Sequence, residues 1–214
     1  YTKTENGWEG VELADLQVMV EDFANGLKNL GINDDDKVAI IGANSRKWAI
    51  SDYAISHIKA VSVPVYPTLI PAQSQYVVEH SESKIAIVQD EIQLDKVYPL
   101  INDANSNLHT IVIMDDSYDG GKDNVVKYAD VFNMKDTQHD IKAISATVEE
   151  NDLLTLIYTS GTTGNPKGVM LSHSNICNNL LSIDSTIKAA MELNPELKPA
   201  DGIERFVSFL PISH

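Results

Sequence analysis

Cysteine is almost absent from this chain of 214 residues, since Cys177 is the only one. A single cysteine cannot form an internal disulfide, and the first residues do not resemble a signal peptide, so we expect a reducing, cytoplasmic setting. Cys177 falls on the apolar side of an expected helix. We therefore expect it to be a core residue rather than a catalytic thiol.

Basic residues are scarce as well. The chain has 16 Lys and Arg against 31 Asp and Glu, which gives a formal net charge of −15. Such a balance repels nucleic acid and anionic membrane surfaces, so we exclude a nucleic-acid partner. An anionic substrate would need local cations. No apolar run approaches the ~18 residues of a membrane-spanning helix, so we expect no transmembrane segment.

Short apolar runs alternate with amphipathic stretches along most of the chain, whose hydrophobic content of 43% is that of an ordinary globular protein. Residues 1–13 suggest a short edge strand or hairpin arm. We expect helices at 15–30, 45–59, 72–80, 94–104 and 176–191, and strands at 38–41, 61–67, 85–88, 110–114, 153–158 and 206–214. This order predicts an α/β fold, with a mostly parallel sheet covered by helices on both faces.

Three polar stretches carry no expected chemistry. Asp34, Asp35 and Asp36 are adjacent but nothing converges with them, so we interpret them as a solvated turn. Residues 115–124 lack the spacing of a calcium-binding loop and are expected to be an exposed loop. Residues 128–150 are expected to form a short helix and a connector.

The most specific stretch is residues 158–168, which read Tyr-Thr-Ser-Gly-Thr-Thr-Gly-Asn-Pro-Lys-Gly. Glycines let backbone amides approach an anion closely, hydroxyls donate further hydrogen bonds, and a lysine adds a mobile positive charge. Apolar runs flank the stretch, so we expect strand, loop and strand. The stretch predicts a loop that holds nucleotide phosphates through Thr159, Ser160, Gly161, Thr162, Thr163, Gly164 and Lys167.

Two other interpretations of this loop compete. A flexible hairpin of the same composition would bind nothing, although it has no need of four hydroxyls and a lysine. The common nucleotide-binding loop G-x-x-x-x-G-K-[ST] needs a helix directly after its lysine. Here Pro166 and Gly168 flank Lys167, and the proline would break such a helix.

Together with Ser-His-Ser-Asn-Ile at 172–176, residues 158–169 resemble the signature of the adenylate-forming superfamily. That superfamily contains acyl-CoA synthetases, adenylation domains of peptide synthetases, and luciferases. Asn-Ser-Arg-Lys-Trp at 44–48 and Val-Pro-Val-Tyr-Pro-Thr at 63–68 resemble long-chain acyl-CoA synthetases. The chain departs from many relatives at Lys59, where they carry glycine, and at Gln73, where they often carry an acid.

The resemblance implies an enzyme that converts a fatty acid, ATP and Mg²⁺ to an acyl-adenylate and then to a thioester of coenzyme A. It implies that residues 160–164 grip the β- and γ-phosphates and that Lys167 closes over them. Thr162 is the expected Mg²⁺ ligand, with Thr159 the alternative. Leu-Pro-Ile-Ser-His at the end of the chain resembles Leu-Pro-x-x-His of the family, which places His214 near the reacting carboxylate.

The resemblance covers only the amino-terminal part of such an enzyme. Residues 1–150 would form the amino-terminal α/β region of the AMP-binding domain, and residues 151–214 the phosphate-binding loop, a long helix and a following strand. The carboxy-terminal domain is missing, so we expect the chain alone to be inactive. The alternatives are an adenylate-forming enzyme for an aryl, amino or short-chain acid, and a non-catalytic nucleotide-binding module. A fatty substrate would imply transient membrane contact, with the protein peripheral to a membrane.

Overall fold

The computed structural model describes residues 2–4, 7–134, 138–159 and 165–197. At the amino terminus, β1 (Thr2–Thr4) and β2 (Gly7–Glu9) pair antiparallel in a small sheet of their own. This pairing confirms the expected hairpin arm.

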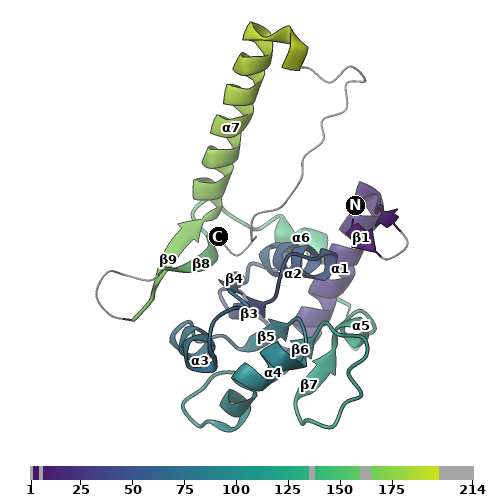
Figure 1. Cartoon of the computed structure of the whole chain (residues 1–214), viewed down its shortest axis with the longest axis vertical. Helices are drawn as coiled ribbons and strands as arrows, with labels where there is room; N and C mark the ends of the chain where they lie inside the picture. The colour runs from purple at the N-terminus through teal and green to yellow at the C-terminus, as the bar shows by residue number, and fades with distance from the viewer. Residues whose placement is uncertain (1, 5–6, 135–137, 160–164, 198–214) are drawn as a thin grey trace.

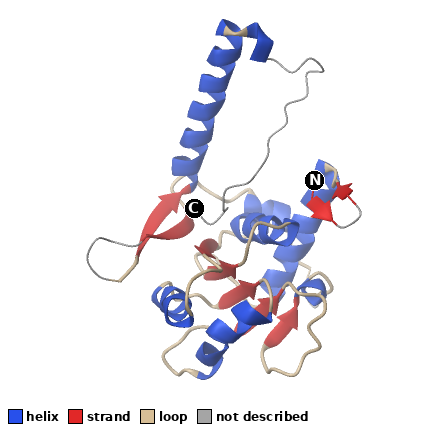
Figure 2. Cartoon of the chain, in the orientation of Figure 1, coloured by secondary structure: helices blue, strands red, loops and turns tan. Residues whose placement is uncertain are grey.

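The body of the protein is built on a seven-stranded sheet of order β7-β6-β5-β3-β4-β8-β9 (Figure 2). Its pairs are parallel except β8–β9, which is antiparallel. The strands are β3 (Lys37–Ile41), β4 (Val61–Val65), β5 (Ile85–Val88), β6 (Thr110–Ile113), β7 (Val125–Lys127), β8 (Leu153–Thr159) and β9 (Lys167–Ser172). The α/β fold with a mostly parallel sheet is confirmed.

Helices cover both faces of the sheet, and each face has its own apolar core (Figure 1). One core contains residues of α1 (Leu13–Asn29), α2 (Arg46–His57), α5 (Tyr128–Val131) and α6 (Ile141–Ser145). The other contains residues of α3 (Pro71–His80), α4 (Glu91–Val97) and the 3₁₀ turn η1 (Tyr98–Asn102). Alternating strands and helices bury the sheet in this way because both faces of parallel strands are apolar.

The ends of the helices follow local chemistry. After α1, Gly31 has φ +93°, its N–H donates to Lys28 O, and the N–H of Ile32 donates to Leu27 O. This is the Schellman arrangement that the expected glycine cap requires. At the start of α2, Ser45 Oγ accepts a hydrogen bond from Trp48 N at 3.1 Å.

Two predictions of secondary structure were wrong in detail. The helix expected at 94–104 begins at Glu91 instead, since Asp90 caps it, and it tightens into η1 because Pro99 cannot continue the α-helical hydrogen bonds. Residues 128–150 contain two short helices, α5 and α6, rather than one helix and a connector, and β7 directly before them was not expected.

The long helix α7 (His173–Leu193) is followed by the 3₁₀ turn η2 (Pro195–Leu197), and α7 rises away from the body in Figure 1. None of its residues is buried. Cys177 is therefore exposed, and its expected place in a core is wrong. The reason is that α7 packs mainly against β9 and η2 within the described residues, so its apolar stripe has no opposite layer. No helix of the described residues is long and apolar enough to cross a membrane.

Candidate functional site

The expected strand–loop–strand unit is confirmed. β8 and β9 form an antiparallel hairpin whose last partners are Thr159 and Lys167, with Tyr158 opposite Gly168 on the rung before. In Figure 1 the hairpin projects from the edge of the sheet. The predicted phosphate ligands Ser160, Gly161, Thr162, Thr163 and Gly164 lie outside the described residues, as does His214, so their roles stay predictions.

The hairpin loop follows the carboxyl end of β8, which runs parallel to β4. In open α/β sheets, ligands bind beyond the carboxyl ends of the strands, usually where neighbouring connections leave to opposite faces. Here that switch lies between β3 and β5, whose following helices α2 and α4 belong to different cores.

The crevice at this switch is closed by a side chain. Gln89 Oε1 accepts a hydrogen bond from Ala43 N at 2.7 Å. A Cβ placed on Gly42 would lie only 3.2 Å from Gln89 Cβ, so the two loops are in close contact. We therefore place the candidate anion site at the β8–β9 hairpin rather than at the switch point.

The two faces of the hairpin differ. Successive side chains of a strand point to opposite sides. Thr155, Ile157, Thr159, Val169 and Leu171 line a cleft of about 360 Å³, together with Trp48, Asp52, Pro64, Leu154 and Ile176. Leu156 packs in the core that α3 and α4 cover, so the alternate face of the hairpin is directed toward those helices.

Lys167 is exposed and has no ion-pair partner among the described residues. By contrast, Lys47, Lys59 and Lys84 all lie within 3.1 Å of a carboxylate oxygen. A lysine without a carboxylate partner in a strongly acidic protein keeps its charge available for an anionic ligand. As the cross-strand partner of Thr159, it stands beside the entrance to the predicted loop.

Asp52 contributes the one carboxylate among the side chains that line the cleft. Burial raises the pKa of Asp52, and the neighbouring hydroxyl of Ser62 has a smaller effect in the opposite direction. Ser62 Oγ is itself buried and makes no hydrogen bond of good geometry with the described residues, so we take burial as the governing cause. Apart from Thr155 and Thr159 the rest of the lining is apolar, and an ionised Asp52 would repel an anion placed inside the cleft.

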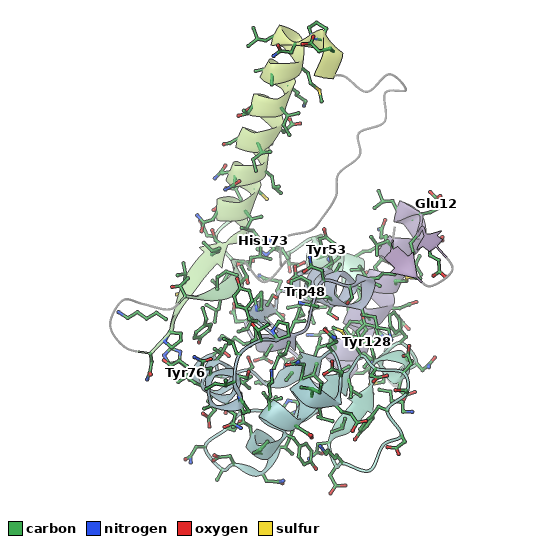
Figure 3. All side chains as sticks on the ribbon, in the orientation of Figure 1. Glu12, Trp48, Tyr53, Tyr76, Tyr128 and His173 are labelled. Atoms are coloured by element: carbon green, nitrogen blue, oxygen red, sulfur yellow. The ribbon has the colours of Figure 1, made fainter. Side chains whose placement is uncertain are left out.

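Two aromatic residues of α3 contact the hairpin, and Tyr76 is labelled beside it in Figure 3. Tyr76 Oη donates to Pro166 O at 3.0 Å, and His80 Nδ1 lies 2.8 Å from Tyr158 Oη. Desolvation, with a smaller effect of Tyr76, raises the pKa of Tyr158 to about 12. Sequence reasoning missed Tyr76 and His80. The available signal was their spacing of four residues, which places both rings on one side of a helix.

The segment Ser172–Ile176, which belongs to the recognised signature, starts α7. Ser172 and Asn175 form a capping box, with Asn175 Oδ1 accepting from Ser172 N at 2.9 Å. His173 (Figure 3) follows directly, and burial lowers its pKa while Asp152 acts in the opposite direction. Ser172 and Asn175 therefore fix the start of α7.

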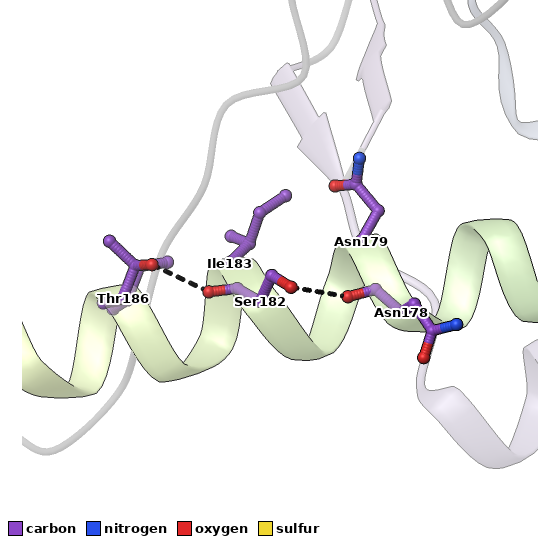
Figure 4. A pocket seen from close by; sticks show the side chains of 6 residues that line it. Asn178, Asn179, Ser182, Ile183 and Thr186 are labelled. Atoms are coloured by element: carbon purple, nitrogen blue, oxygen red, sulfur yellow. Dashed lines mark hydrogen bonds between the residues drawn. The ribbon is translucent and has the colours of Figure 1, made fainter.

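Other candidate sites carry less. The described residues contain no group of three His, Cys, Asp or Glu that could hold a metal ion. Asp34 and Asp35 lie in an exposed turn, whereas Asp36 pairs with Lys84 at 2.8 Å. A hollow of about 530 Å³ runs along α7 (Figure 4). Its hydroxyls bond to the helix itself, Ser182 Oγ to Asn178 O and Thr186 Oγ1 to Ser182 O, both at 2.8 Å.

Comparison with known proteins extends over nearly the whole chain. The sequence profile of the family described as AMP-binding enzyme matches residues 3–214. A long-chain-fatty-acid–CoA ligase of Mycobacterium bovis is 30% identical over 97% of this chain and 32% of its own length. Another such ligase, from Xenopus laevis, is 32% identical over 89% of this chain and 25% of its own length.

Solved structures share the fold. An anthranilate CoA ligase in complex with anthranoyl-AMP gives a TM-score of 0.64 at 24% identity, over 75% of this chain and 29% of that protein. A long-chain-fatty-acid–CoA ligase of Archaeoglobus fulgidus gives 0.65 at 22% identity, over 84% of this chain and 34% of that protein. This chain thus spans about a third or less of the curated relatives named above.

Proposed function

Because the chain belongs to the AMP-binding enzyme family, we propose that it carries the phosphate-binding, amino-terminal part of an enzyme that activates a carboxylic acid with ATP and transfers it to coenzyme A. The observation that carries the proposal is the β8–β9 hairpin. It puts Lys167, exposed and without a described carboxylate partner, beside Thr159 at the ends of a glycine- and hydroxyl-rich loop.

A long-chain fatty acid is the proposed acid. The relatives from Mycobacterium bovis and Xenopus laevis are both named long-chain-fatty-acid–CoA ligases, and each matches most of this chain. The segments 44–48 and 63–68 resemble the same group of enzymes. The location of such a protein in the cell would depend on its substrate. A cytoplasmic location with transient membrane contact therefore stays a prediction.

The proposed chemistry needs no protein nucleophile. A carboxylate oxygen of the acid forms a bond to the α-phosphorus of ATP, the bond to the bridging oxygen breaks, and pyrophosphate leaves with the electron pair. The sulfur of coenzyme A then attacks the carbonyl carbon, AMP leaves, and the thiol proton passes to solvent. Both steps depend on in-line positioning and on neutralising charge on the leaving oxygens.

The residues of this chain would act on the leaving group. Amides and hydroxyls of residues 159–164 would hold the β- and γ-phosphates, and the ammonium of Lys167 would lie against the oxygens that gain negative charge. Lys167 is suited to this because its side chain is exposed and no described carboxylate competes for it. Ile157, Val169 and Leu171 give the cleft side of the hairpin an apolar lining.

Mg²⁺ prefers oxygen ligands and is commonly held by one or two protein groups together with substrate phosphates. The donor set here fits that use, since hydroxyls are present at the loop and the described residues offer no cage of three carboxylates. Thr162 would be its ligand, or else Thr159. The ion would supply charge neutralisation on the phosphates.

Thioester formation by the complete protein tests the proposal. Purified protein is incubated with ATP, Mg²⁺ and coenzyme A across a panel of palmitate, octanoate, acetate, benzoate and an amino acid. We expect thioester from the long-chain acid, with release of AMP and pyrophosphate. If only benzoate or acetate gave product, the proposed substrate would be that acid rather than a fatty acid. If no acid gave an adenylate, the protein would be a non-catalytic nucleotide-binding module. This chain alone should give no product.

A further inference from the structure

The β8–β9 hairpin has a short hydrogen-bonded register with the rest of its sheet. Its ladder with β4 contains the single register pair Ser62 and Thr155. Pro64 lies two residues further along β4 and has no N–H with which to continue the ladder. Residues 156–159 and 167–170 therefore extend beyond the point where the neighbouring strand holds them.

Beyond that point, the hairpin is contacted by a second element, the helix α3. Tyr76 Oη donates to Pro166 O at 3.0 Å, and His80 Nδ1 shares a hydrogen bond of 2.8 Å with Tyr158 Oη. The rings of Tyr76 and His80 are 5.2 Å apart, and the rings of His80 and Tyr158 meet edge to face at 5.7 Å. These contacts form one chain of aromatic residues from the helix to the hairpin.

The contacts fall at both ends of the loop. Tyr158 lies directly before Thr159, and Pro166 directly before Lys167. Opposite Tyr158 stands Gly168, and a Cβ built there would lie 3.2 Å from the Tyr158 ring. The absence of a side chain at Gly168 lets the ring lie against the partner strand, where His80 holds its hydroxyl.

We propose that Tyr76 and His80 are positioning residues of the phosphate-binding loop: α3 holds the two ends of the loop through Pro166 and Tyr158, and so fixes Thr159 and Lys167 in place. This rests on the proposed function, since the benefit of a fixed loop is the pre-organised binding of ATP phosphates. A positioned cation acts without reorganisation at the moment of reaction, and a loosely held one loses part of its effect.

The test uses the complete protein with the variants Tyr76→Phe, His80→Gln and His80→Asn. Phenylalanine removes only the hydroxyl that donates to Pro166. Asparagine places its amide where Nδ1 stood, whereas glutamine places it nearer Nε2. Gln73→Ala is the matched control, because Gln73 is exposed on the same helix and its side chain forms no hydrogen bond with the described residues of the hairpin.

ATP–pyrophosphate exchange at saturating acid separates kcat from the KM for ATP. We expect Tyr76→Phe and His80→Gln to lower kcat/KM for ATP about tenfold, the effect of one hydrogen bond, with the KM for the acid unchanged. His80→Asn should recover most of the loss, and Gln73→Ala should match the wild type. Equal losses in His80→Asn and His80→Gln, or unchanged kinetics in all variants, would overturn the proposal.

Hydrogen exchange measured by mass spectrometry gives a readout that does not depend on activity. The peptides that cover 156–159 and 167–170 should exchange about tenfold faster in Tyr76→Phe and His80→Gln, but not in Gln73→Ala. If the wild type shows no exchange of pyrophosphate with any acid, the proposed function fails while this result still decides the role of α3. Unchanged protection of the hairpin in both variants overturns the role of α3 alone.

Discussion

Thr159 and Lys167 are partners in the last rung of the β8–β9 hairpin, so the whole of residues 160–166 lies between them. Directly opposed residues of an antiparallel pair extend to the same face. That face is the one from which Ile157, Val169 and Leu171 line the cleft. The hydroxyl and the ammonium thus bracket the predicted loop from one side, with apolar side chains behind them.

From this arrangement we expect Lys167→Ala to lower kcat for ATP–pyrophosphate exchange about a hundredfold in the complete protein, because one preorganised contact to developing charge contributes ~3 kcal/mol. The KM for the acid should change little, since the ammonium faces phosphates. Lys142→Ala is the control: Lys142 is also exposed, and its partner Glu21 lies on α1, away from the hairpin. Equal rates for both variants would remove Lys167 from the mechanism.

Gly26 is the position in α1 where the backbone leaves no room for a side chain. A Cβ there would lie 2.2 Å from the carbonyl oxygen of Val131, on α5. We expect Gly26→Ala to reduce the free energy of unfolding by about 2 kcal/mol, because overpacking against backbone outweighs the better helix propensity of alanine.

Denaturant unfolding of the complete protein measures this loss, with Asp22→Ala as the control on the same helix. Asp22 is exposed, so alanine there should be neutral or slightly stabilising. A Gly26→Ala variant as stable as the control would mean that α1 and α5 can separate without cost.

The sequence predicted the parts of the fold that rest on local pattern. Ser45 caps the start of α2 and Gly31 caps the end of α1, as expected, because capping depends on neighbouring residues alone. β7 was missed because Val125–Lys127 is too short for a periodicity and is set by its pairing with β6. The placement of Cys177 in a core was wrong. An apolar stripe shows that one face of a helix is suited to burial, but it does not show which element packs against that face.

The candidate site divides in the same way. The phosphate-binding role of the loop and Lys167 stays a prediction, which the sequence could offer because the glycines, hydroxyls and lysine lie within one short stretch. Tyr76 and Pro166 are separated by 90 residues, and no pattern in the sequence joins them. Lys59, one of the positions where the chain departs from the expected pattern, has φ +56°, a left-handed backbone conformation that favours glycine.

Asp152 should make the protein sensitive to acid. Its Oδ2 accepts from Glu149 N at 2.7 Å and lies 3.1 Å from Lys59 Nζ. The hydrogen bond from Glu149, and then Lys59, hold the pKa of Asp152 below its ordinary value. A folded-state pKa below the unfolded value of about 3.9 stabilises the fold above that pH, and the gain is lost as pH falls through the folded value.

We therefore expect Asp152→Asn to lower the melting temperature at pH 7 and to approach the wild type at pH 3 and below. Lys59→Gly separates the two causes, because glycine keeps the left-handed backbone while the ammonium is removed. Lys59→Gly should remove only the part of the pH-dependent stability that comes from the ion pair, which is smaller than the part that comes from the Glu149 hydrogen bond. A difference between Asp152→Asn and wild type that is constant from pH 7 to pH 2.5 would contradict this role.

Asp52 should behave in the opposite sense. Burial raises its pKa, so the folded state disfavours the carboxylate. The resulting cost is absent below the unfolded pKa of about 3.9, grows as pH rises to the folded value, and is constant above it. Asp52→Asn keeps the shape and removes the charge. We expect the variant to melt at a higher temperature than the wild type at pH 7 and at the same temperature near pH 3, with exposed Asp22→Asn showing no such trend. If Asp52→Asn were instead less stable at pH 7, a group that favours the carboxylate, such as the Ser62 hydroxyl, would have to outweigh burial.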